Sequence, residues 1–406
     1  MRCGCAVRVH RRETVMRTDD LHATRRLLQS SAIVGVYTTE QGDLSHSNDE
    51  LLLEAIEGAL ADAGLTIEDV DGIAGGRSPT DSAATAFPAY WSELLGHPMR
   101  YFSTVDAAAA AHSANILHAA LAVAAGLAQT IVVIGGGSRG ASRQANVEKM
   151  AYAHGEFDVS WGTLVPSWFA LAARRHMHEF GTTSEQLAEI AVSTRMWAAM
   201  HPQAIMQKPL TIADVTDSRM ISDPLHLFDC CISNDGAGAM VITTKERARD
   251  CRKAAVQVLG GAEDYTFQGY VNVMHDWMES GAVHTGARSL QMAGLGHDDI
   301  DLLEIYDCFT ITALRMLEDL GFCKKGEGGA FVSDGKLRPA GSHPMNTHGG
   351  GLSWGHSFSG LAHGIEAVRQ IRGECGARQV PGAETALVHS QGGPLAMHST
   401  VILARA

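Results

Sequence analysis

The sequence predicts an α/β protein made of two similar halves, in which helices cover both faces of mostly parallel sheets. Two observations carry this prediction. Short apolar runs alternate with helical patterns along the chain, which is typical of parallel sheets flanked by helices. A helix–turn–strand unit also occurs twice with identical spacing, at 63–73 and at 293–303, more than two hundred residues apart. So long a period indicates a duplicated domain, and 406 residues are enough for one.

The first half begins with a strand, a turn and a helix. Residues 32–38 form a short apolar run and predict the first strand. Ser47 and Glu50 have the spacing of a capping box, so we expect a helix to begin there. This helix continues over 51–63 and ends at Gly64, a residue that readily adopts the left-handed conformation of a helix end.

A second repeated pattern supports the duplication. A turn and a helix over 105–126 precede a strand at 130–134, and the same order returns at 349–373 and 385–389. The two echoes together predict two related α/β halves in one chain.

These patterns divide the chain. We expect an N-terminal extension over 1–30, a first half over 31–255 and a second half over 256–406, with the boundary near 245–255. Residues 141–228 are richer in Met, Trp and His and predict an insertion of helices and loops. An insertion of this kind is a candidate for covering a substrate.

Composition excludes several classes of protein. Hydrophobic residues make up 45% of the chain and charged residues 19%, which argues against disorder. A formal net charge of −13 gives no basic surface for nucleic acid or an anionic membrane. The longest apolar stretch, 105–126, is expected to be a buried helix and not a membrane span, because it holds Asp106, His112, Asn115 and His118. We therefore expect a cytoplasmic protein without a secretory signal.

The eight cysteines are irregularly spaced and predict no disulfide framework and no zinc ribbon. Cys230 and Cys231 are adjacent, and neighbouring side chains in a strand point to opposite faces, so they cannot both serve one site. We expect both cysteines to act as small, buried hydrophobic residues.

Two further motifs are weak. Residues 135–140 satisfy G-x-G-x-x-G after a strand, but such turns are common in a chain with 43 glycines, so nucleotide binding is not favoured. His176-Met177-His178-Glu179 could be half of a metal site, yet nothing completes it and Arg174-Arg175 would repel a cation. We expect a surface helix there and predict no metal site.

The strongest chemical signal in the second half follows its strand at 302–305. Tyr306, Asp307 and Cys308 lie between that strand and a helix over 310–320. The carboxyl ends of parallel strands host the chemistry of α/β proteins, so these three side chains are a candidate acid/base set. A capping role for Asp307 and a core role for Cys308 remain open.

A glycine-rich run over 346–356 is the most unusual segment. Glycines let the backbone approach a ligand, and the amides of Gly350 and Gly351 could hold an oxyanion. His356 could act as a base or as an oxyanion donor. With His348 and Ser353 in the same run, and with a similar turn at Gly392-Gly393 after the last strand, the second half is expected to contain a catalytic cleft.

These motifs resemble those of the thiolase superfamily, specifically the sterol-carrier-protein-x type thiolases and the bacterial lipid-transfer thiolase-like proteins. The run 306–309 matches the family's Y/H-D-C-F, and 346–356 matches N-x-S-G-G-x-x-S-x-G-H with His348 in place of Ser. Residues 174–181 resemble the loop-domain signature A-R-R-Y-M-H-E-Y-G. The resemblance extends from about Ala32 to the C-terminus. It implies a thiolase fold, with two βαβαβαββ halves in an α-β-α-β-α arrangement and an inserted loop domain.

One departure changes the chemistry that the resemblance implies. A thiolase carries its acyl group on the Cys of V-E-A-A-C-A-S-G-S, and the matching residue here is Ala109. The second thiolase cysteine is replaced around Ser390-Gln391-Gly392, and Ser357 stands where a Pro normally follows His356. Without a nucleophile at this position the usual acyl-enzyme cannot form.

The resemblance then implies a fold that binds a CoA thioester and stabilises an enolate. Relatives that lack this Cys cleave β-hydroxyacyl-CoA by a retro-aldol reaction in steroid side-chain degradation, and we expect that reaction here. Tyr306 would move the proton, Asp307 would orient Tyr306, Cys308 would share the proton, and His356 with the loop amides would hold the oxyanion. Coenzyme A would enter as part of the substrate, with no tightly bound cofactor. The residues expected to bind it are Gly350, Gly351, Ser353, Gly392 and Gly393, and His348 is a further catalytic candidate.

Two alternatives remain. One is acyl transfer or Claisen condensation, as in an acetyl-CoA acetyltransferase, with Cys308 or another residue as nucleophile. The other is a non-catalytic thiolase-like subunit, in which Ala109 marks a decayed site. The resemblance also implies a homodimer and a small partner protein with an OB-fold and a zinc ribbon.

Overall fold

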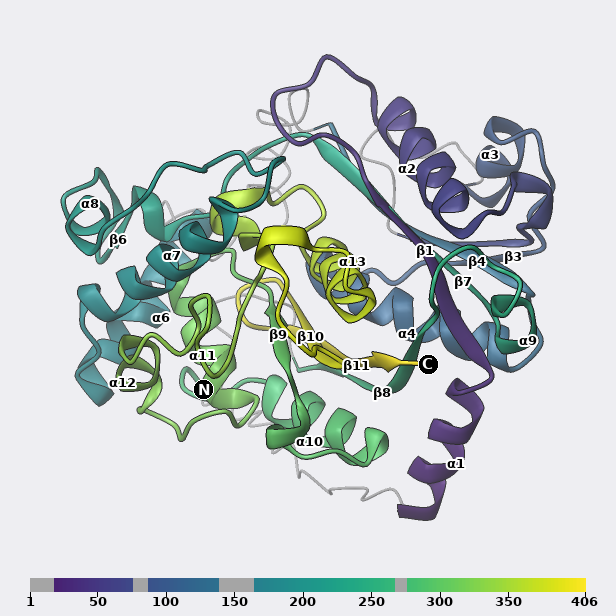
Figure 1. Cartoon of the computed structure of the whole chain (residues 1–406). Helices are drawn as coiled ribbons and strands as arrows, with labels where there is room; N and C mark the ends of the chain where they lie inside the picture. The colour runs from purple at the N-terminus through teal and green to yellow at the C-terminus, as the bar shows by residue number, and fades with distance from the viewer. Residues whose placement is uncertain (1–17, 76–86, 139–163, 267–275) are drawn as a thin grey trace, which may run out of the picture.

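The computed structural model describes residues 18–75, 87–138, 164–266 and 276–406. The first half begins with a short N-terminal helix, and the insertion interrupts it before its last strand (Figure 1). Its elements are α1 (Thr18–Leu28), β1 (Ser31–Thr38), α2 (Asn48–Ala63), β2 (Gly72–Gly75), α3 (Phe87–Leu94), β3 (Tyr101–Ser103), α4 (Ala111–Ala124), β4 (Thr130–Gly137), β7 (Gly236–Thr244) and α9 (Lys245–Ala248).

The second half repeats this order of strands and helices. Its elements are β8 (Val256–Tyr265), α10 (Ala282–Ala293), β9 (Leu302–Ile305), α11 (Thr310–Asp319), α12 (Gly328–Ser333), α13 (Ser359–Arg372), β10 (Thr385–Gly392) and β11 (Met397–Arg405). A five-residue π-helical turn, Gly350–Trp354, precedes α13.

The described part of the segment 141–228, in which helices and loops were expected, contains helices, loops and a small hairpin. Its described elements are α6 (Val165–Phe180), α7 (Ser184–Ala198), α8 (Ile212–Thr216), β5 (Met220–Ser222) and β6 (Leu225–His226). Helix α7 packs against α11, α12 and the π-helical turn, so the insertion covers the second half.

The described strands other than β5 and β6 form one mixed sheet in the order β3-β2-β4-β7-β1-β8-β11-β10-β9. The two halves of this sheet meet at a single residue pair, Ile33 with Val256. Strand β2 is parallel to β4 and β3, and β9 is parallel to β10, whereas the remaining neighbours pair antiparallel. The expectation of mostly parallel sheets is therefore wrong, because the strands that join and complete the two halves run antiparallel to their neighbours.

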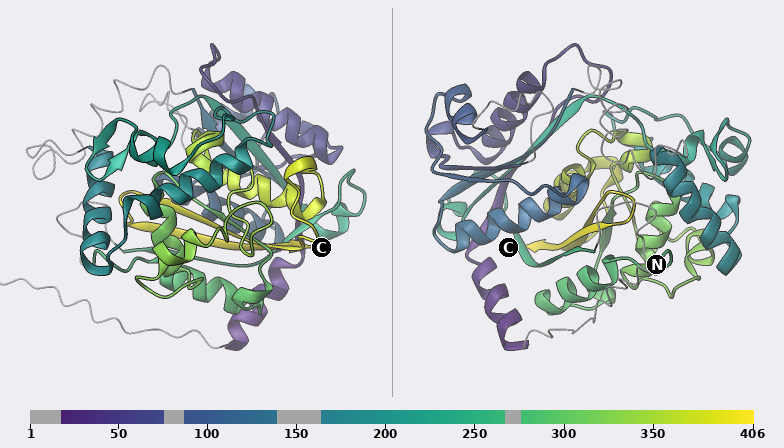
Figure 2. Two further views of the ribbon diagram at one scale, coloured as in Figure 1. Left: turned by 60° about the vertical axis from the view of Figure 1, so that its left-hand side comes forward. Right: turned by 180° about the vertical axis from the view of Figure 1, so that it is seen from behind.

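The helices form the layers that the resemblance implies. Helices α4 and α13 both contact strands of the two halves, so they form the central layer. Figures 1 and 2 show α2 on the outer side of the first half and α10 on the outer side of the second. This confirms the α-β-α-β-α arrangement. None of the described helices is both long and apolar enough to cross a membrane.

Local signals at the helix ends are confirmed. Ser47 and Glu50 form a capping box at the start of α2. Gly64 ends α2 and Gly294 ends α10, both in the left-handed conformation, with φ of 75° and 63°. The helix expected over 105–126 is α4.

The duplicated unit also repeats a backbone-binding carboxylate. Asp71, just before β2, accepts hydrogen bonds from the amides of Gln129 (2.9 Å) and Thr130 (2.8 Å) at the start of β4. Asp301, just before β9, accepts them from Glu384 (2.8 Å) and Thr385 (2.9 Å) at the start of β10. These carboxylates hold equivalent parallel strands in register in both halves.

The second half departs from the expected strand count at one position. Where the first half has β3 beside β2, the second has only an isolated parallel bridge between Leu303 and Met345 beside β9. The chain at this edge then enters the glycine-rich run, so the segment that would be a strand leads directly into the candidate site.

The structure also places the two weaker motifs, the one around His176 and the one at 135–140. His176 was expected on a surface helix, but it is wholly buried, with Nδ1 2.8 Å from Thr182 Oγ1 and Nε2 3.0 Å from Glu318 Oε2. In the 135–140 motif, the amide of Ser138 donates to Asn48 Oδ1 at 2.5 Å. Gly135, Gly136 and Gly137 form the end of β4, and residues 139 and 140 lie outside the described residues.

Candidate active site

Tyr306 and His356 meet at the candidate site. The Tyr306 hydroxyl lies 2.7 Å from Nε2 of His356, within hydrogen-bond distance. Tyr306 follows β9, and its amide donates to the carbonyl of His389 in β10 at 3.0 Å. The tyrosine is 7% exposed and His356 is half-buried, so the pair is sheltered but open on the His356 side.

His356 is held in place by the segment that leads from the insertion back to β7. Its amide donates to Oδ1 of Asn234 at 2.7 Å, and Asn234 Nδ2 donates to Gln41 Oε1 at 2.9 Å. Ser357, in place of the family's Pro, donates its hydroxyl to the carbonyl of Gly236 at 2.6 Å. Asn234 and Gln41 were not singled out from the sequence, because only the fold brings these distant segments together.

Asp307 holds the glycine loop and not Tyr306. Its Oδ1 accepts the amide of Gly351 at 2.7 Å, and its Oδ2 lies 3.5 Å from the amide of Leu352. A Cβ on Gly350, whose φ is 58°, would overlap this carboxylate, so the close approach requires glycine. These contacts assign Asp307 to holding the loop, and its expected role in orienting Tyr306 stays a prediction. The Gly351 amide is also already occupied by the protein's own anion and is not free for a substrate oxyanion.

The other glycine and serine candidates pack the site's framework. Ser353 is buried, and its hydroxyl accepts a hydrogen bond from Nε of Arg195 on α7 at 2.9 Å. Gly392 ends β10, and a Cβ there would overlap the carbonyl of Ala107. Gly393 follows in the turn to β11, with φ of 61°. These contacts fix the loops against the insertion and against the start of α4.

Ala109 lies in a 3-10 turn, Ala108–Ala110, directly before α4. It is half-buried and packs against the core cluster that includes Tyr306 and Cys308. A Cβ on Gly360 would lie 3.0 Å from its carbonyl oxygen and would overlap Ser390 Oγ, so α13 and β10 both approach this turn closely. The methyl group of Ala109 therefore occupies the position at which the resemblance places the acyl carrier.

Cys308 is buried and cannot readily become a thiolate. Burial raises its pKa well above the ordinary range, and the nearby Cys231 adds to this effect. Its sulfur lies 3.4 Å from Oγ1 of Thr312, and a side-chain hydrogen bond also joins it to Tyr306. The thiol thus lies within reach of the Tyr306 hydroxyl, but it is protonated at neutral pH. Cys230 and Cys231 are half-buried against the same core, beside Phe309 and Cys308.

His348 is separate from the Tyr306–His356 pair. It is 2% exposed, its ring packs edge-on against those of Trp354 and His363, and burial lowers its pKa to about 3. Its Nδ1 lies 3.2 Å from Oε2 of Glu304 in β9. Glu304 and His363 were missed from the sequence; a glutamate inside the apolar strand Leu302–Ile305 was the available signal.

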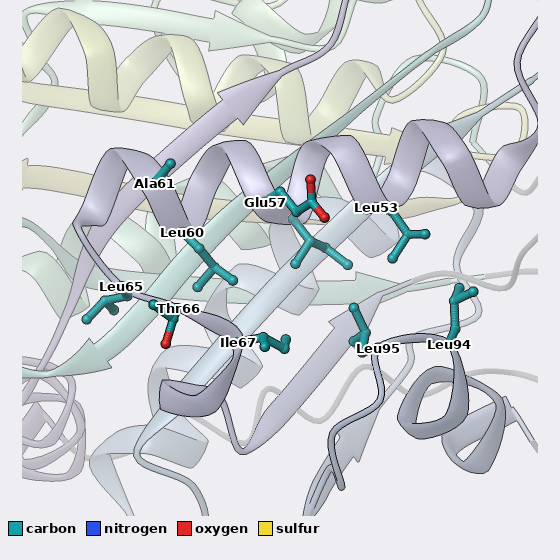
Figure 3. Close-up of a pocket in the computed structure, with 10 residues that line it drawn as sticks. Leu53, Glu57, Leu60, Ala61, Leu65, Thr66, Ile67, Leu94 and Leu95 are labelled. Carbon is teal, nitrogen blue, oxygen red and sulfur yellow. The ribbon is translucent and has the colours of Figure 1, made fainter.

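A groove of about 360 Å³ lies elsewhere in the molecule. Figure 3 shows it between the outer side of α2, the turn that follows α2, and the end of α3, with Leu53, Leu60 and Leu94 among its lining residues. It belongs to the outer face of the first half and shares no residue with the candidate site.

Comparison with known proteins decides the family. A model of the thiolase N-terminal domain matches residues 31–223, and a model of the thiolase C-terminal domain-like family matches 263–405. The chain belongs to the thiolase superfamily. Proteins named sterol carrier protein 2 are also among its relatives, which places this thiolase-like chain in the sterol-carrier and lipid-transfer branch.

Three relatives of this thiolase-like chain have similar identities. A "steroid side-chain-cleaving aldolase" of Thermomonospora curvata is 35% identical, over 85% of this chain and 90% of its own. A "17-hydroxy-3-oxo-4-pregnene-20-carboxyl-CoA lyase" of Mycobacterium tuberculosis is 36% identical, over 88% and 95%. An "acetyl-CoA acetyltransferase" of Methanothermobacter thermautotrophicus is 34% identical, over 90% and 97%.

A solved structure described as "Ltp2-ChsH2(DUF35) aldolase" has a TM-score of 0.82 and 32% identity, and it covers 93% of this thiolase-like chain and 98% of its own. The family and its named members make the chain a thiolase-like acyl-CoA enzyme. Lyases and acetyltransferases are both present among relatives of nearly equal identity, so the choice of reaction depends on the site.

Proposed function

We propose that the chain is an acyl-CoA carbon–carbon lyase that cleaves a β-hydroxyacyl-CoA by a retro-aldol reaction. The observation that carries this proposal is the Tyr306–His356 hydrogen bond in a site whose acyl-carrier position is Ala109. Such a site retains a proton-transfer pair and lacks a nucleophile. The aldolase and lyase names of two relatives support the same reaction class.

The reaction needs no co-reactant. Tyr306 accepts the proton of the β-hydroxyl group while its own proton moves to Nε2 of His356. The bond between the α- and β-carbons breaks, the β-carbon becomes a carbonyl, and the electron pair forms the enolate of the shorter acyl-CoA. The proton on His356 returns through Tyr306 to the α-carbon. Atoms and charges balance without water or free CoA.

Three candidate positions for a nucleophile argue against acyl transfer. Ala109 has no group that could hold a thioester. The thiol of Cys308 is buried and its pKa is raised, and it is joined to Thr312 and Tyr306. Ser390, in place of the second thiolase cysteine, is buried with its hydroxyl 2.6 Å from that of Ser113. None of these groups is activated by an adjacent base.

The finer assignments follow from the relatives. The substrate is a CoA thioester of a steroid acid, as the name of the Mycobacterium tuberculosis lyase suggests, and CoA is present only as part of it. A homodimer completed by a DUF35-type partner is the assembly, as the description of the similar aldolase structure suggests. The cytoplasm is the proposed location.

The test is incubation of the purified chain, with and without a DUF35-type partner, with 17-hydroxy-3-oxo-4-pregnene-20-carboxyl-CoA. The proposal expects a 17-ketosteroid and propionyl-CoA in equal amounts without added CoA. A requirement for free CoA would show thiolysis, and a mass increase of the chain by an acyl group would show acyl transfer. Either result would overturn the lyase assignment, and inactivity in every combination, over a panel of β-hydroxyacyl-CoA esters, would favour a non-catalytic subunit.

A further inference from the structure

A buried cluster of two histidines and a glutamate lies behind the glycine loop. Glu304 comes from β9, His348 from the loop and His363 from the central helix α13. All three residues are at most 2% exposed. One carboxylate oxygen and one ring nitrogen from each histidine lie within 4.8 Å of one another.

Four buried polar atoms of the cluster make no hydrogen bond of good geometry. Oε1 of Glu304 accepts hydrogen bonds from the amide (3.0 Å) and hydroxyl (3.1 Å) of Thr347, whereas Oε2 has no hydrogen-bond partner. Nδ1 of His363 donates to the carbonyl of Ser359, whereas Nε2 makes no hydrogen bond of good geometry and lies 3.6 Å from Oδ1 of Asp307. Nε2 of His348 has none either, and Nδ1 lies 3.2 Å from Oε2 of Glu304 without forming a hydrogen bond of good geometry. Buried polar atoms without partners are costly, so several in one place need an explanation.

We propose that Glu304, His348 and His363 bind one divalent transition-metal ion. An ion equidistant from three atoms that lie within 4.8 Å of one another is at most about 2.8 Å from each, and a small contraction gives the roughly 2.0–2.2 Å of Zn²⁺ bonds to nitrogen and oxygen. Two imidazoles with one carboxylate suit Zn²⁺, Co²⁺ and Fe²⁺. The carbonyl of Ser359 fixes the His363 ring with Nε2 toward the ion, as outer partners of metal-bound histidines do.

The charges around the cluster favour a cation. Burial raises the pKa of Glu304 to about 8; the charge of His363 opposes this shift and the charge of Glu366 adds to it. Glu366 is already paired with Arg378, at 2.8 Å and 2.9 Å, and is not a candidate ligand. Burial keeps His348 neutral, the form that binds a metal.

The ion's role is structural. It would join β9, the glycine loop and α13 directly behind Asp307, whose Oδ1 lies 3.6 Å from Nε2 of His363 and holds the Gly351 amide. It would thereby fix the loop that ends at His356. The inference does not depend on the reaction proposed above.

Metal binding by the wild-type chain is measured first. The untagged chain is purified without chelator and its metal content is determined by mass spectrometry. It is then treated with chelator and titrated with Zn²⁺ by calorimetry and with Co²⁺ by visible absorption. We expect one equivalent per chain, d–d absorption bands for Co²⁺ and a higher melting temperature with metal. Absence of stoichiometric binding of Zn²⁺, Co²⁺, Fe²⁺ and Mn²⁺, both to this chain and to chain refolded with each metal, overturns the proposal.

Variants then locate the ion. His348→Gln and His363→Gln are expected to weaken Zn²⁺ binding at least tenfold and to abolish the Co²⁺ bands. His178→Gln, on the exposed side of α6, is the matched control and should bind as the wild type does. Binding that persists in both cluster variants would show a different site and overturn the assignment. If a cluster variant does not fold, the Co²⁺ spectrum of the wild type decides, because a nitrogen- and oxygen-bound ion differs from one bound to cysteine.

Discussion

The two halves of the molecule share one framework but not one chemistry. Strands β2 and β9 have the same register against β4 and β10, and their third residues are Ala74 and Glu304, both buried. After β9 the chain places Tyr306 beside His356, whereas the turn before α4 in the first half offers only alanines. The first half therefore has alanine at the position of the acyl carrier, and the proposed function rests on the Tyr306–His356 pair of the second half.

The largest expected effect is on Tyr306. Tyr306→Phe removes the hydroxyl that contacts His356 and should lower kcat/KM for the β-hydroxyacyl-CoA by roughly 100- to 10,000-fold, because the proton-transfer group is lost. The melting temperature should change little. Tyr37→Phe, which removes a hydroxyl bonded to Glu54 in the first half, is the control and should keep nearly full activity. Equal losses in both variants would mean that the second half has no special role.

The second prediction concerns the buried charge pair of the second half. Glu366 and Arg378 are 1% and 7% exposed. Burial opposes ionisation of Glu366, but the hydrogen bonds and charge of Arg378 outweigh it and lower its pKa. Glu366→Gln would leave the guanidinium without its partner and should lower the free energy of unfolding by about 3–5 kcal/mol.

The control for that prediction is an exposed pair. Glu384→Gln removes a partner of Arg405 at 3.8 Å on the surface and should cost less than about 1 kcal/mol. Urea unfolding of both variants tests the difference. Similar values would show that burial of the Glu366–Arg378 pair has no energetic consequence.

The repeated carboxylates test the duplication itself. Asp71→Ala and Asp301→Ala each remove a charged acceptor of two strand amides, and each should lower the free energy of unfolding by about 1.5–3 kcal/mol. Asp301 is the more exposed of the two, so its loss should cost less. Because the sites share no partner, the double variant should be additive within about 0.5 kcal/mol in urea unfolding. A large excess would show that the halves unfold as one coupled unit.

The sequence could predict features that depend on residues close to one another along the chain, but not contacts between residues far apart along it. The capping box of Ser47 and Glu50 and the left-handed Gly64 and Gly294 are local, and they are confirmed. The repeated spacing correctly predicted the duplicated framework. The buried state of His176 was missed because its partner Glu318 is 142 positions away.

The site shows the same limit. The motifs identified Tyr306 and His356, and the structure brings them together. The same motifs could not show that Asp307 binds the Gly351 amide, or that His348 faces Glu304 instead of the substrate side. Which partner a buried polar group finds depends on how distant segments pack, and spacing along the chain does not record that.

The smallest predicted effect lies where the halves touch. His118 of α4 and Glu263 of β8 approach to 2.6 Å, and their side chains are 38% and 17% exposed. The hydrogen bond that Glu263 accepts raises the pKa of His118. Burial would raise the pKa of Glu263, but the hydrogen bonds of His118 and Tyr265 and the charge of His118 outweigh it and lower that pKa. The contribution of His118 is therefore present below the unfolded histidine pKa of about 6.5 and is lost as pH rises through its folded value.

His118→Gln should consequently cost about 0.5 kcal/mol at pH 6, after allowance for solvent screening, and close to nothing at pH 9. Urea unfolding at the two pH values measures it. His46→Gln, which alters an exposed pair with Glu50 at 4.0 Å within the first half, is the matched control and should show no such difference between the two pH values. A pH-independent loss for His118→Gln would mean that packing of the ring, and not its charge, connects α4 to the second half.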